Sequence, residues 1–218
     1  MTTFAPRLET LPAAQRRVWA ELRTDLPDSF VLYGGTALAL RTGSRESEDF
    51  DFFANDPVDA HRLAATVPFL AGAELIQAAP MNATFLVDRQ GRVKVSFFGG
   101  LTLGRVGEVS ISADTGVRVA SLLDLAARKV RVVQVRAERK DYADLLTLMQ
   151  HGIALSTALG AAQSLYPDSA PLVSLKALSY FSDGDLDQLP DHVKTTLADA
   201  AASVRTIEAV PVRNQRLT

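Results

Sequence analysis

Two short motifs near the start of the chain combine residue types that bind nucleotides. Gly34-Gly35 stands between an apolar run at residues 30–33 and a run of helix formers, and Asp49-Phe50-Asp51 follows a charged loop. Glycines at the start of a helix let phosphates reach the free N–H groups of its first turn, and paired carboxylates hold Mg²⁺ that bridges phosphate oxygens. The two motifs together indicate metal-assisted phosphoryl transfer.

The two aspartates are predicted to share one face of a strand. Residues two apart in a strand point the same way, so Asp49 and Asp51 project to one side while Phe50 and Phe52 project into the core. Each motif also has an ordinary reading, because a glycine pair often forms a plain turn and Asp-x-Asp often lies in an exposed loop. Their order and proximity favour a site.

A lysine and an aspartate in the second half of the chain extend this set. At 100° per residue Lys129 falls within the apolar stripe of residues 122–133, so its ammonium is predicted to enter a cleft and meet nucleotide phosphate; alternatively, its stem snorkels to water. Asp141 has three open roles: to orient Lys129, to act as a base, or to begin a helix. Asp144 is predicted to lie further toward solvent.

Basic residues also gather around this segment. Between residues 128 and 140 the only acid is Glu138, and six positions are basic: Arg128, Lys129, Arg131, Arg136, Arg139 and Lys140. Such a cluster could hold the backbone of tRNA or another RNA, or an anionic substrate, and the alternative is a solvated helix face.

The elements that must position these residues change character along the chain. Strands are predicted at residues 30–33, 49–53, 74–78, 84–87, 93–98 and 109–112, with helices at 11–24, 36–41 and 58–67. From residue 121 onward only helices are predicted, at 122–133, 142–149, 155–166, 172–181 and 191–207, and the last few residues are expected to be frayed. This pattern predicts an α+β fold, with a catalytic α/β domain at 1–118 and a helical domain at 119–218 that completes the active-site cleft.

Composition excludes several classes of site. The 218 residues contain no cysteine, which rules out disulfides and thiolate metal sites, and the three histidines lack metal-binding spacing. The formal charge of −2 gives no global attraction for nucleic acid. No apolar stretch approaches the roughly 18–20 residues of a membrane span, and no secretory signal is seen, so we expect a cytoplasmic protein.

Three segments resemble the AbiEii/AbiGii toxin family of nucleotidyltransferases. They are residues 34–40 (GGTALAL), residues 49–53 (DFDFF), and residues 121–145, which run from SLLDL through Lys129 to RKDYADL. Residues 175–181 (LKALSYF) also resemble a late family segment, so the resemblance covers most of the chain. It implies a mixed sheet of the DNA polymerase β type followed by helices.

The resemblance also implies an activity. This activity is the Mg²⁺-dependent transfer of a nucleoside monophosphate from an NTP to an acceptor, which is RNA or protein. The enzyme would be the toxin of a toxin–antitoxin or phage-defence system, and a cognate antitoxin would be a further partner. By its matching positions, the resemblance implies that Gly34, Gly35 and Thr36 bind the phosphates, that Asp49 and Asp51 bind the metal, and that Lys129 binds the nucleotide. It also implies a catalytic or orienting role for Asp141.

One position departs from the wider superfamily, which usually has a third catalytic carboxylate on a neighbouring strand. The strand at residues 93–98 offers Ser96 there, with Lys94 on the same face. Sequence does not place the possible substitutes, which are Asp88, Glu108 and Asp114.

Three functions therefore remain open. The first is an active, toxin-like nucleotidyltransferase. The second is a catalytically silent protein that binds nucleotides or a partner and has lost the third acid. The third is a nucleotidyltransferase that modifies small molecules, of the aminoglycoside-modifying kind. Transfer of label from an NTP, and the size of the acceptor, distinguish them.

Overall fold

The computed structural model describes residues 2–218, except for the side chains of residues 23–25. The chain forms two compact units. The sheet unit contains the described residues up to Leu103 together with Glu108–Ser121 and Asn214–Thr218, and the helical unit contains Gly104–Gly107 and Leu122–Arg213. A mixed sheet with helices, followed by helices alone, confirms the predicted fold class.

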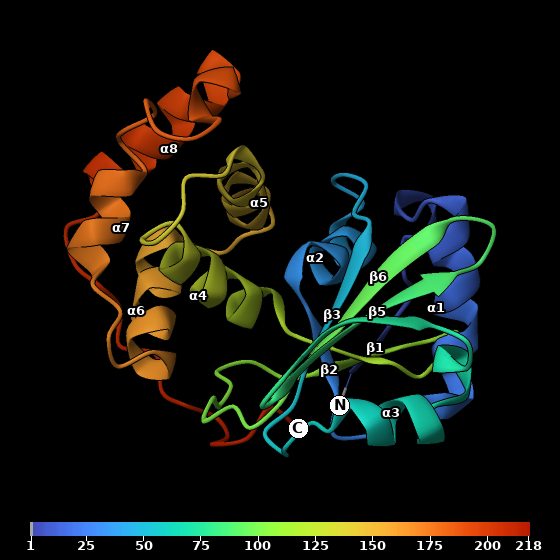
Figure 1. The fold of residues 1–218 in the computed structure, drawn as a ribbon. Helices are drawn as coiled ribbons and strands as arrows, with labels where there is room; N and C mark the ends of the chain where they lie inside the picture. Colours follow the sequence, from blue (N-terminus) through green and yellow to red (C-terminus); the bar gives the residue numbers. More distant parts are fainter. Residues whose placement is uncertain (1) are drawn as a thin grey trace. The chain divides into compact units, whose positions relative to one another are not determined.

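The sheet unit is built on one eight-stranded sheet (Figure 1), in the order β1-β7-β8-β2-β3-β6-β5-β4. β3 runs antiparallel to β2 and parallel to β6, and β4, β5 and β6 form an antiparallel meander. The strands are β1 (Thr2–Phe4), β2 (Val31–Tyr33), β3 (Asp49–Phe53), β4 (Glu74–Ala79), β5 (Asn82–Asp88), β6 (Arg92–Phe98), β7 (Ser110–Ser112) and β8 (Arg118–Val119).

Three α-helices accompany the sheet: α1 (Ala13–Asp25), α2 (Gly34–Thr42) and α3 (Ala60–Thr66). Short 3₁₀ turns lie at Leu8–Thr10 and Pro68–Leu70. The prediction began the second helix at residue 36, whereas α2 starts at Gly34, so the glycine pair forms its first turn. The sequence analysis also missed β1 and β8, because strands of two or three residues carry too little alternation to be recognised.

Aromatic residues fill the core on one face of the sheet. Phe50 and Phe52 are fully buried, and Trp19 of α1 stacks on Phe50 with ring centroids 6.1 Å apart. Phe97 of β6 lies opposite Phe52 in the parallel register. Strand alternation therefore places Asp49 and Asp51 on the other face of the sheet, as predicted.

The helical unit contains α4 (Leu122–Val132), α5 (Arg139–Gln150), α6 (Leu155–Leu165), α7 (Pro171–Ala177) and α8 (Asp191–Ser203). Two predicted helices were too long. α7 ends at Ala177, and Phe181 beyond it packs edge-on against Tyr142. α8 ends at Ser203, because the following chain runs extended along α6, where Ser164 donates to the carbonyl of Val210.

The C-terminal residues are anchored, which corrects the expectation that they are frayed. Leu217 is fully buried in the sheet unit, and its N–H donates to Asn55 Oδ1 over 2.8 Å. Arg216 forms an ion pair with Asp56. Polar sequence at a chain end does not reveal such anchoring, because the binding partners lie about 160 residues away.

No single helix within residues 2–218 has the length and hydropathy needed to cross a membrane. Among the described helices, one pair, α5 and α6, reaches the required length and hydropathy when taken together, and these two helices are bent by 116° relative to each other.

The C-terminal anchor gives a stability prediction. We expect Leu217→Ala to lower the free energy of unfolding of the sheet unit by about 2–5 kcal/mol, because it empties a fully buried site. Trp19 lies in this unit and is the only tryptophan, so its fluorescence during urea unfolding measures the effect. Ile76→Ala, at a position 46% exposed on β4, is the control and should cost less than about 1 kcal/mol. Equal losses for the two variants would contradict the anchor.

Candidate active site

The diglycine turn and the second aspartate are in close contact. Tyr33 of β2 pairs with Asp51 of β3, so the residue after Tyr33 lies beside the Asp51 carboxylate. A β-carbon built on Gly34 would lie 2.6 Å from Asp51 Oδ2, and Gly34 has a φ of +74°. Only glycine fits at this position, and the carboxylate therefore lies directly against the first residue of α2.

Two residues that the sequence analysis did not single out lie at the second glycine. A β-carbon built on Gly35 would lie 2.7 Å from Arg45 Nη2 and 3.0 Å from Ser47 Oγ. Arg45 also donates to the carbonyl of Glu46 over 2.9 Å. Their spacing in the sequence could have revealed them, because Arg45 and Ser47 precede Asp49 at alternate positions. Alternate residues of an extended chain point to the same side. A guanidinium at a helix N-terminus suits phosphate binding.

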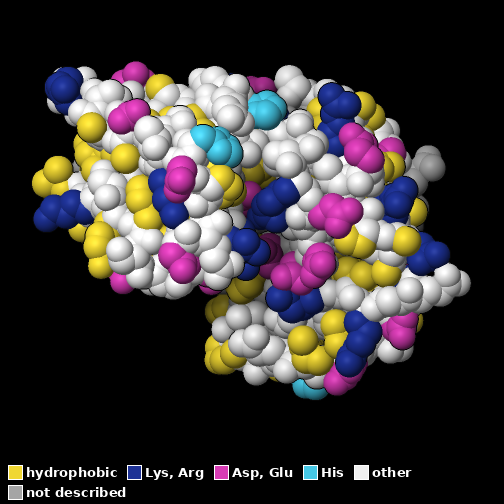
Figure 2. All heavy atoms as spheres, turned by 90° about the horizontal axis from the view of Figure 1, so that it is seen from above, with side chains coloured by type: hydrophobic (Ala, Val, Ile, Leu, Met, Phe, Trp, Pro, Cys, Tyr) yellow, Lys and Arg dark blue, Asp and Glu magenta, His cyan; other side chains and the backbone are white. Residues whose placement is uncertain are grey.

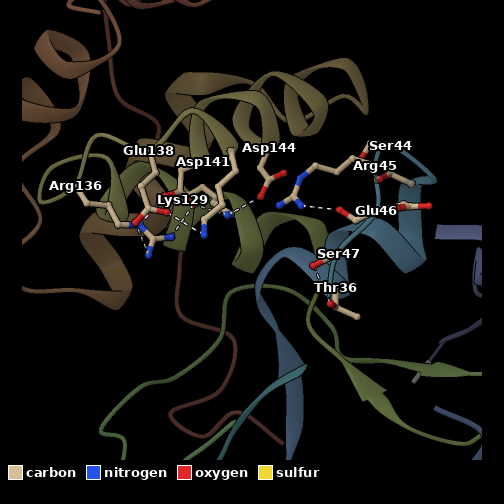
Figure 3. Close-up of polar contacts among 12 residues, drawn as sticks. Thr36, Ser44, Arg45, Glu46, Ser47, Lys129, Arg136, Glu138, Asp141 and Asp144 are labelled. Carbon is tan, nitrogen blue, oxygen red and sulfur yellow. Dashed lines mark hydrogen bonds and ion pairs between the residues drawn. The ribbon is translucent and has the colours of Figure 1, made fainter. Parts of the chain in front are cut away.

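The Thr36 side chain faces the interior of the sheet unit. It is fully buried, accepts from Gln15 Nε2 over 3.2 Å, and lies 2.9 Å from Ser47 Oγ (Figure 3). Its hydroxyl also donates to the carbonyl of Asp49. The side chain thus joins α1 and α2 to the start of β3, and only its backbone remains for the predicted contact with a nucleotide.

Asp49 is ion-paired with Lys94 across the sheet. The two residues are register partners on β3 and β6, and Lys94 Nζ lies 2.7 Å from Asp49 Oδ2, with both side chains 44% exposed. The hydrogen bond to Asp49 raises the pKa of Lys94 against the opposing effect of burial, and the charges of Asp49 and Asp51 add to the rise. The Lys94 ammonium is therefore attracted electrostatically by both carboxylates.

Ser96 occupies the position at which a third acid was sought. It is the register partner of Asp51 on β6, and its hydroxyl lies 3.4 Å from that of Thr84. Asp88 is the register partner of Arg92. Arg92 lies four residues from Ser96 on β6, which is about 13 Å along the strand, so Asp88 is far from Ser96. Asp114 accepts from Trp19 Nε1 over 2.9 Å, which is a structural contact. Neither aspartate replaces the missing carboxylate.

The donor set fits a metal that arrives with its nucleotide. Within residues 2–218, no group of three or more histidine, aspartate or glutamate side chains is placed to share a metal ion. Asp49 and Asp51 offer carboxylate oxygens on one face of β3. Mg²⁺ is commonly bound by one or two carboxylates and completes its shell with water and substrate phosphates. Two aspartates on one strand face, of which Asp51 lies against a helix N-terminus, meet that requirement.

The helical unit contains a buried charge cluster, drawn in Figure 3. Lys129 of α4 is 8% exposed, and its Nζ lies 2.6 Å from both Asp141 Oδ1 and Asp144 Oδ2 of α5. Asp141 and Asp144 are 0% and 1% exposed. The prediction that Asp144 lies toward solvent was wrong, because the lysine draws both acids of this helix face inward.

Both oxygens of Asp141 are engaged. Arg136 Nε donates to Oδ2 over 2.7 Å, and Lys129 donates to Oδ1 over 2.6 Å. Burial alone would raise the pKa of Asp141, but the hydrogen bond from Arg136 and the charge and hydrogen bond of Lys129 outweigh it, so the pKa is lowered. This geometry is compatible with the orienting role, and Asp141 also lies in the first turn of α5, as the helix-beginning role expects.

The basic cluster of residues 128–140 is largely paired with acids of the helical unit. Arg131 pairs with Asp168, Arg136 with Asp141 and Glu138, Arg139 with Asp185, and Lys140 with Glu138. On the face shown in Figure 2, basic and acidic side chains are interspersed. Because its basic residues form the ion pairs given above, the cluster is not a uniformly positive surface.

Comparison with known proteins identifies the family. Residues 17–209 match the family described as nucleotidyl transferase AbiEii toxin of type IV toxin–antitoxin systems. The chain belongs to this family. An uncharacterized protein of Aquifex aeolicus (strain VF5) is 30% identical over 159 residues, which are 72% of this chain and 75% of that protein.

One solved structure is also similar to this AbiEii family member. It is an antigenic nucleotidyltransferase-like protein from Paracoccidioides brasiliensis, with a TM-score of 0.44 and 15% sequence identity over 81% of this chain and 85% of that one. The family match confirms the resemblance carried by the glycine, aspartate and lysine motifs of the sequence.

The buried cluster of this AbiEii family member gives a second prediction. Lys129→Met leaves two buried carboxylates without their shared cation, so we expect the helical unit to lose about 3–5 kcal/mol of unfolding free energy. Hydrogen exchange of the α4 and α5 amides measures the loss. Arg131→Met on the same helix removes only the ion pair with the exposed Asp168 and should cost less than about 1 kcal/mol. A Lys129 variant as stable as the Arg131 variant would contradict the importance of the cluster.

A third prediction concerns acid. Because the pKa of Asp141 is lower in the folded state, its ionised form stabilises the fold above the usual aspartate value of about 3.9, and this contribution is lost as pH falls toward the lowered pKa. The protection factors of the α5 amides, which correct for the pH dependence of intrinsic exchange, should therefore fall below about pH 4 in the wild type. The pH dependence should be weaker in Asp141→Asn, which cannot ionise. The same pH dependence in both proteins would refute this role of Asp141.

Proposed function

We propose that this chain is a Mg²⁺-dependent nucleotidyltransferase that transfers a nucleoside monophosphate from an NTP to an acceptor hydroxyl. The single observation that carries the proposal is the contact of the Asp51 carboxylate with Gly34 at the first turn of α2. It joins an acidic ligand to a phosphate-binding helix start in one place. Membership of the AbiEii family supports the same activity.

The residues of the sheet unit suit the parts of an NTP. The backbone N–H groups at the start of α2 and the Arg45 guanidinium bind triphosphate oxygens. Asp49 and Asp51 would hold Mg²⁺, which would neutralise charge on the phosphates and stabilise the leaving group. Thr36 positions Asp49 by its hydrogen bond to the Asp49 carbonyl.

The transfer is a substitution at the α-phosphorus. The acceptor oxygen forms a new bond to that phosphorus, the bond to the oxygen bridging to the β-phosphate breaks, and pyrophosphate leaves. The acceptor proton passes to water. Asp141 does not act as the base in this proposal, because both its oxygens already accept hydrogen bonds from cations.

We propose a positioning role for Lys129 and Asp141 of the helical unit. The Lys129 ammonium is shared between two buried acids, which engage two of its three N–H donors. These salt bridges hold α4 and α5 together. Loss of either side chain would therefore disturb the helical unit as a whole.

The acceptor we propose is RNA, and the physiological setting is a type IV toxin–antitoxin pair with a cognate antitoxin. The family description supports the setting. Because its basic residues are mostly ion-paired, the helical unit would recognise a particular RNA shape rather than any polyanion.

The test is label transfer from each of the four NTPs, labelled at the α-phosphate, in the presence of Mg²⁺. Total tRNA, a protein lysate and low-molecular-weight hydroxyl compounds are offered separately as acceptors. We expect Asp51→Asn to reduce transfer at least about 100-fold, because one metal ligand is lost. Asp56→Asn, which alters only the exposed ion pair with Arg216, should retain activity. Equal activity of the two variants refutes the assigned metal site.

A second candidate is a silent nucleotide-binding protein. Ser96 at the position of the third acid and Lys94 on Asp49 favour it. It is supported if calorimetry detects NTP binding while no acceptor becomes labelled. If neither an NTP nor Mg²⁺ binds, both candidates fail.

A further inference from the structure

Lys94 is a cation in direct contact with one of the predicted metal ligands, Asp49. Its Nζ lies 2.7 Å from Asp49 Oδ2, and the charge of Asp51 also acts on it. Lys94 projects from β6 on the face that carries Ser96, and these two residues are the register partners of Asp49 and Asp51. The sheet thus sets an ammonium and a hydroxyl opposite the two carboxylates.

Charge explains why an ammonium is useful at this position. Asp49 and Asp51 are about 7 Å apart along β3 and point the same way, so without a cation they repel each other. A divalent ion removes this repulsion when it is bound. In its absence Lys94 compensates one of the two charges, and it can do so because the side chain is long and half-exposed.

We propose that Lys94 is the resident cation of the aspartate pair: it holds Asp49 while the site is empty, is displaced from Asp49 by the divalent ion, and then binds the triphosphate. This inference rests on the proposed function and deepens it by adding a substrate-binding residue. An ammonium released beside a triphosphate can form charge-assisted hydrogen bonds with the phosphate oxygens.

The two stages give effects of opposite sign when Lys94 is replaced. In Lys94→Met the metal no longer competes with an ammonium, so its affinity for the aspartates rises. The same variant loses a cation that would bind phosphate, so its affinity for triphosphate falls. A purely structural role of Lys94 would weaken both interactions or change neither.

The experiment measures each affinity separately on the full chain. Binding of Mn²⁺ without nucleotide is followed by electron paramagnetic resonance of the free ion, and binding of inorganic tripolyphosphate in EDTA is followed by calorimetry. We expect Lys94→Met to bind Mn²⁺ about fivefold more tightly and tripolyphosphate about fivefold more weakly than the wild type. Lys94→Gln, which also lacks the charge but retains polarity, should behave alike and serves if Lys94→Met does not fold.

Arg216→Met is the matched control. It breaks another 2.7 Å ion pair of the sheet unit, with Asp56, whose side chains are 55% and 57% exposed, and it changes the net charge equally. Both affinities should remain at their wild-type values.

Changes of the same sign, or no change, in the Lys94 variants overturn the inference, while label transfer by the wild type would leave the proposed function standing. If the wild type and all variants fail to bind Mn²⁺, both the inference and the metal-dependent function are refuted.

Discussion

The contact between Asp51 and Gly34 constrains the geometry of the candidate site more than any other. A carboxylate can lie against the start of a helix only where no β-carbon intervenes, and the positive φ of Gly34 independently requires glycine. The antiparallel pairing of Tyr33 with Asp51 then fixes which strand residue meets the turn. Because β3 alternates, the same constraint places Asp49 on the site face and the phenylalanines in the core.

The two units of this AbiEii family member treat charge differently. In the sheet unit, Asp49 and Lys94 are half-exposed, so their interaction is weakened by water and can be exchanged for other ions. In the helical unit, Lys129, Asp141 and Asp144 are buried, where an unpaired charge is costly and each group needs its partners. Exposure therefore separates ionic groups that can respond to a ligand from ionic groups that maintain the fold.

Much of the candidate site could be predicted from local sequence, because strand and helix periodicities decide which neighbours share a face. The pairing of Asp49 with Asp51 and the place of Lys129 on a buried stripe are of this kind. The exposure of Asp144 was predicted wrongly. A prediction from helix periodicity places charged side chains toward solvent and does not include a buried ion-pair partner on another helix. Arg45 escaped notice because its contact with Gly35 depends on how the loop folds back.

The amino-acid sequence by itself determined the order of the longer elements, the two acids on one strand face, the glycines at the helix start and the family resemblance. These features depend on residues within a few positions of one another. Only the tertiary structure decided that Lys94 meets Asp49, that Thr36 is enclosed beside Gln15, and that Leu217 returns to the sheet unit. Such contacts join residues far apart in the chain, and the free energy of packing, which no local pattern encodes, selects among the alternatives.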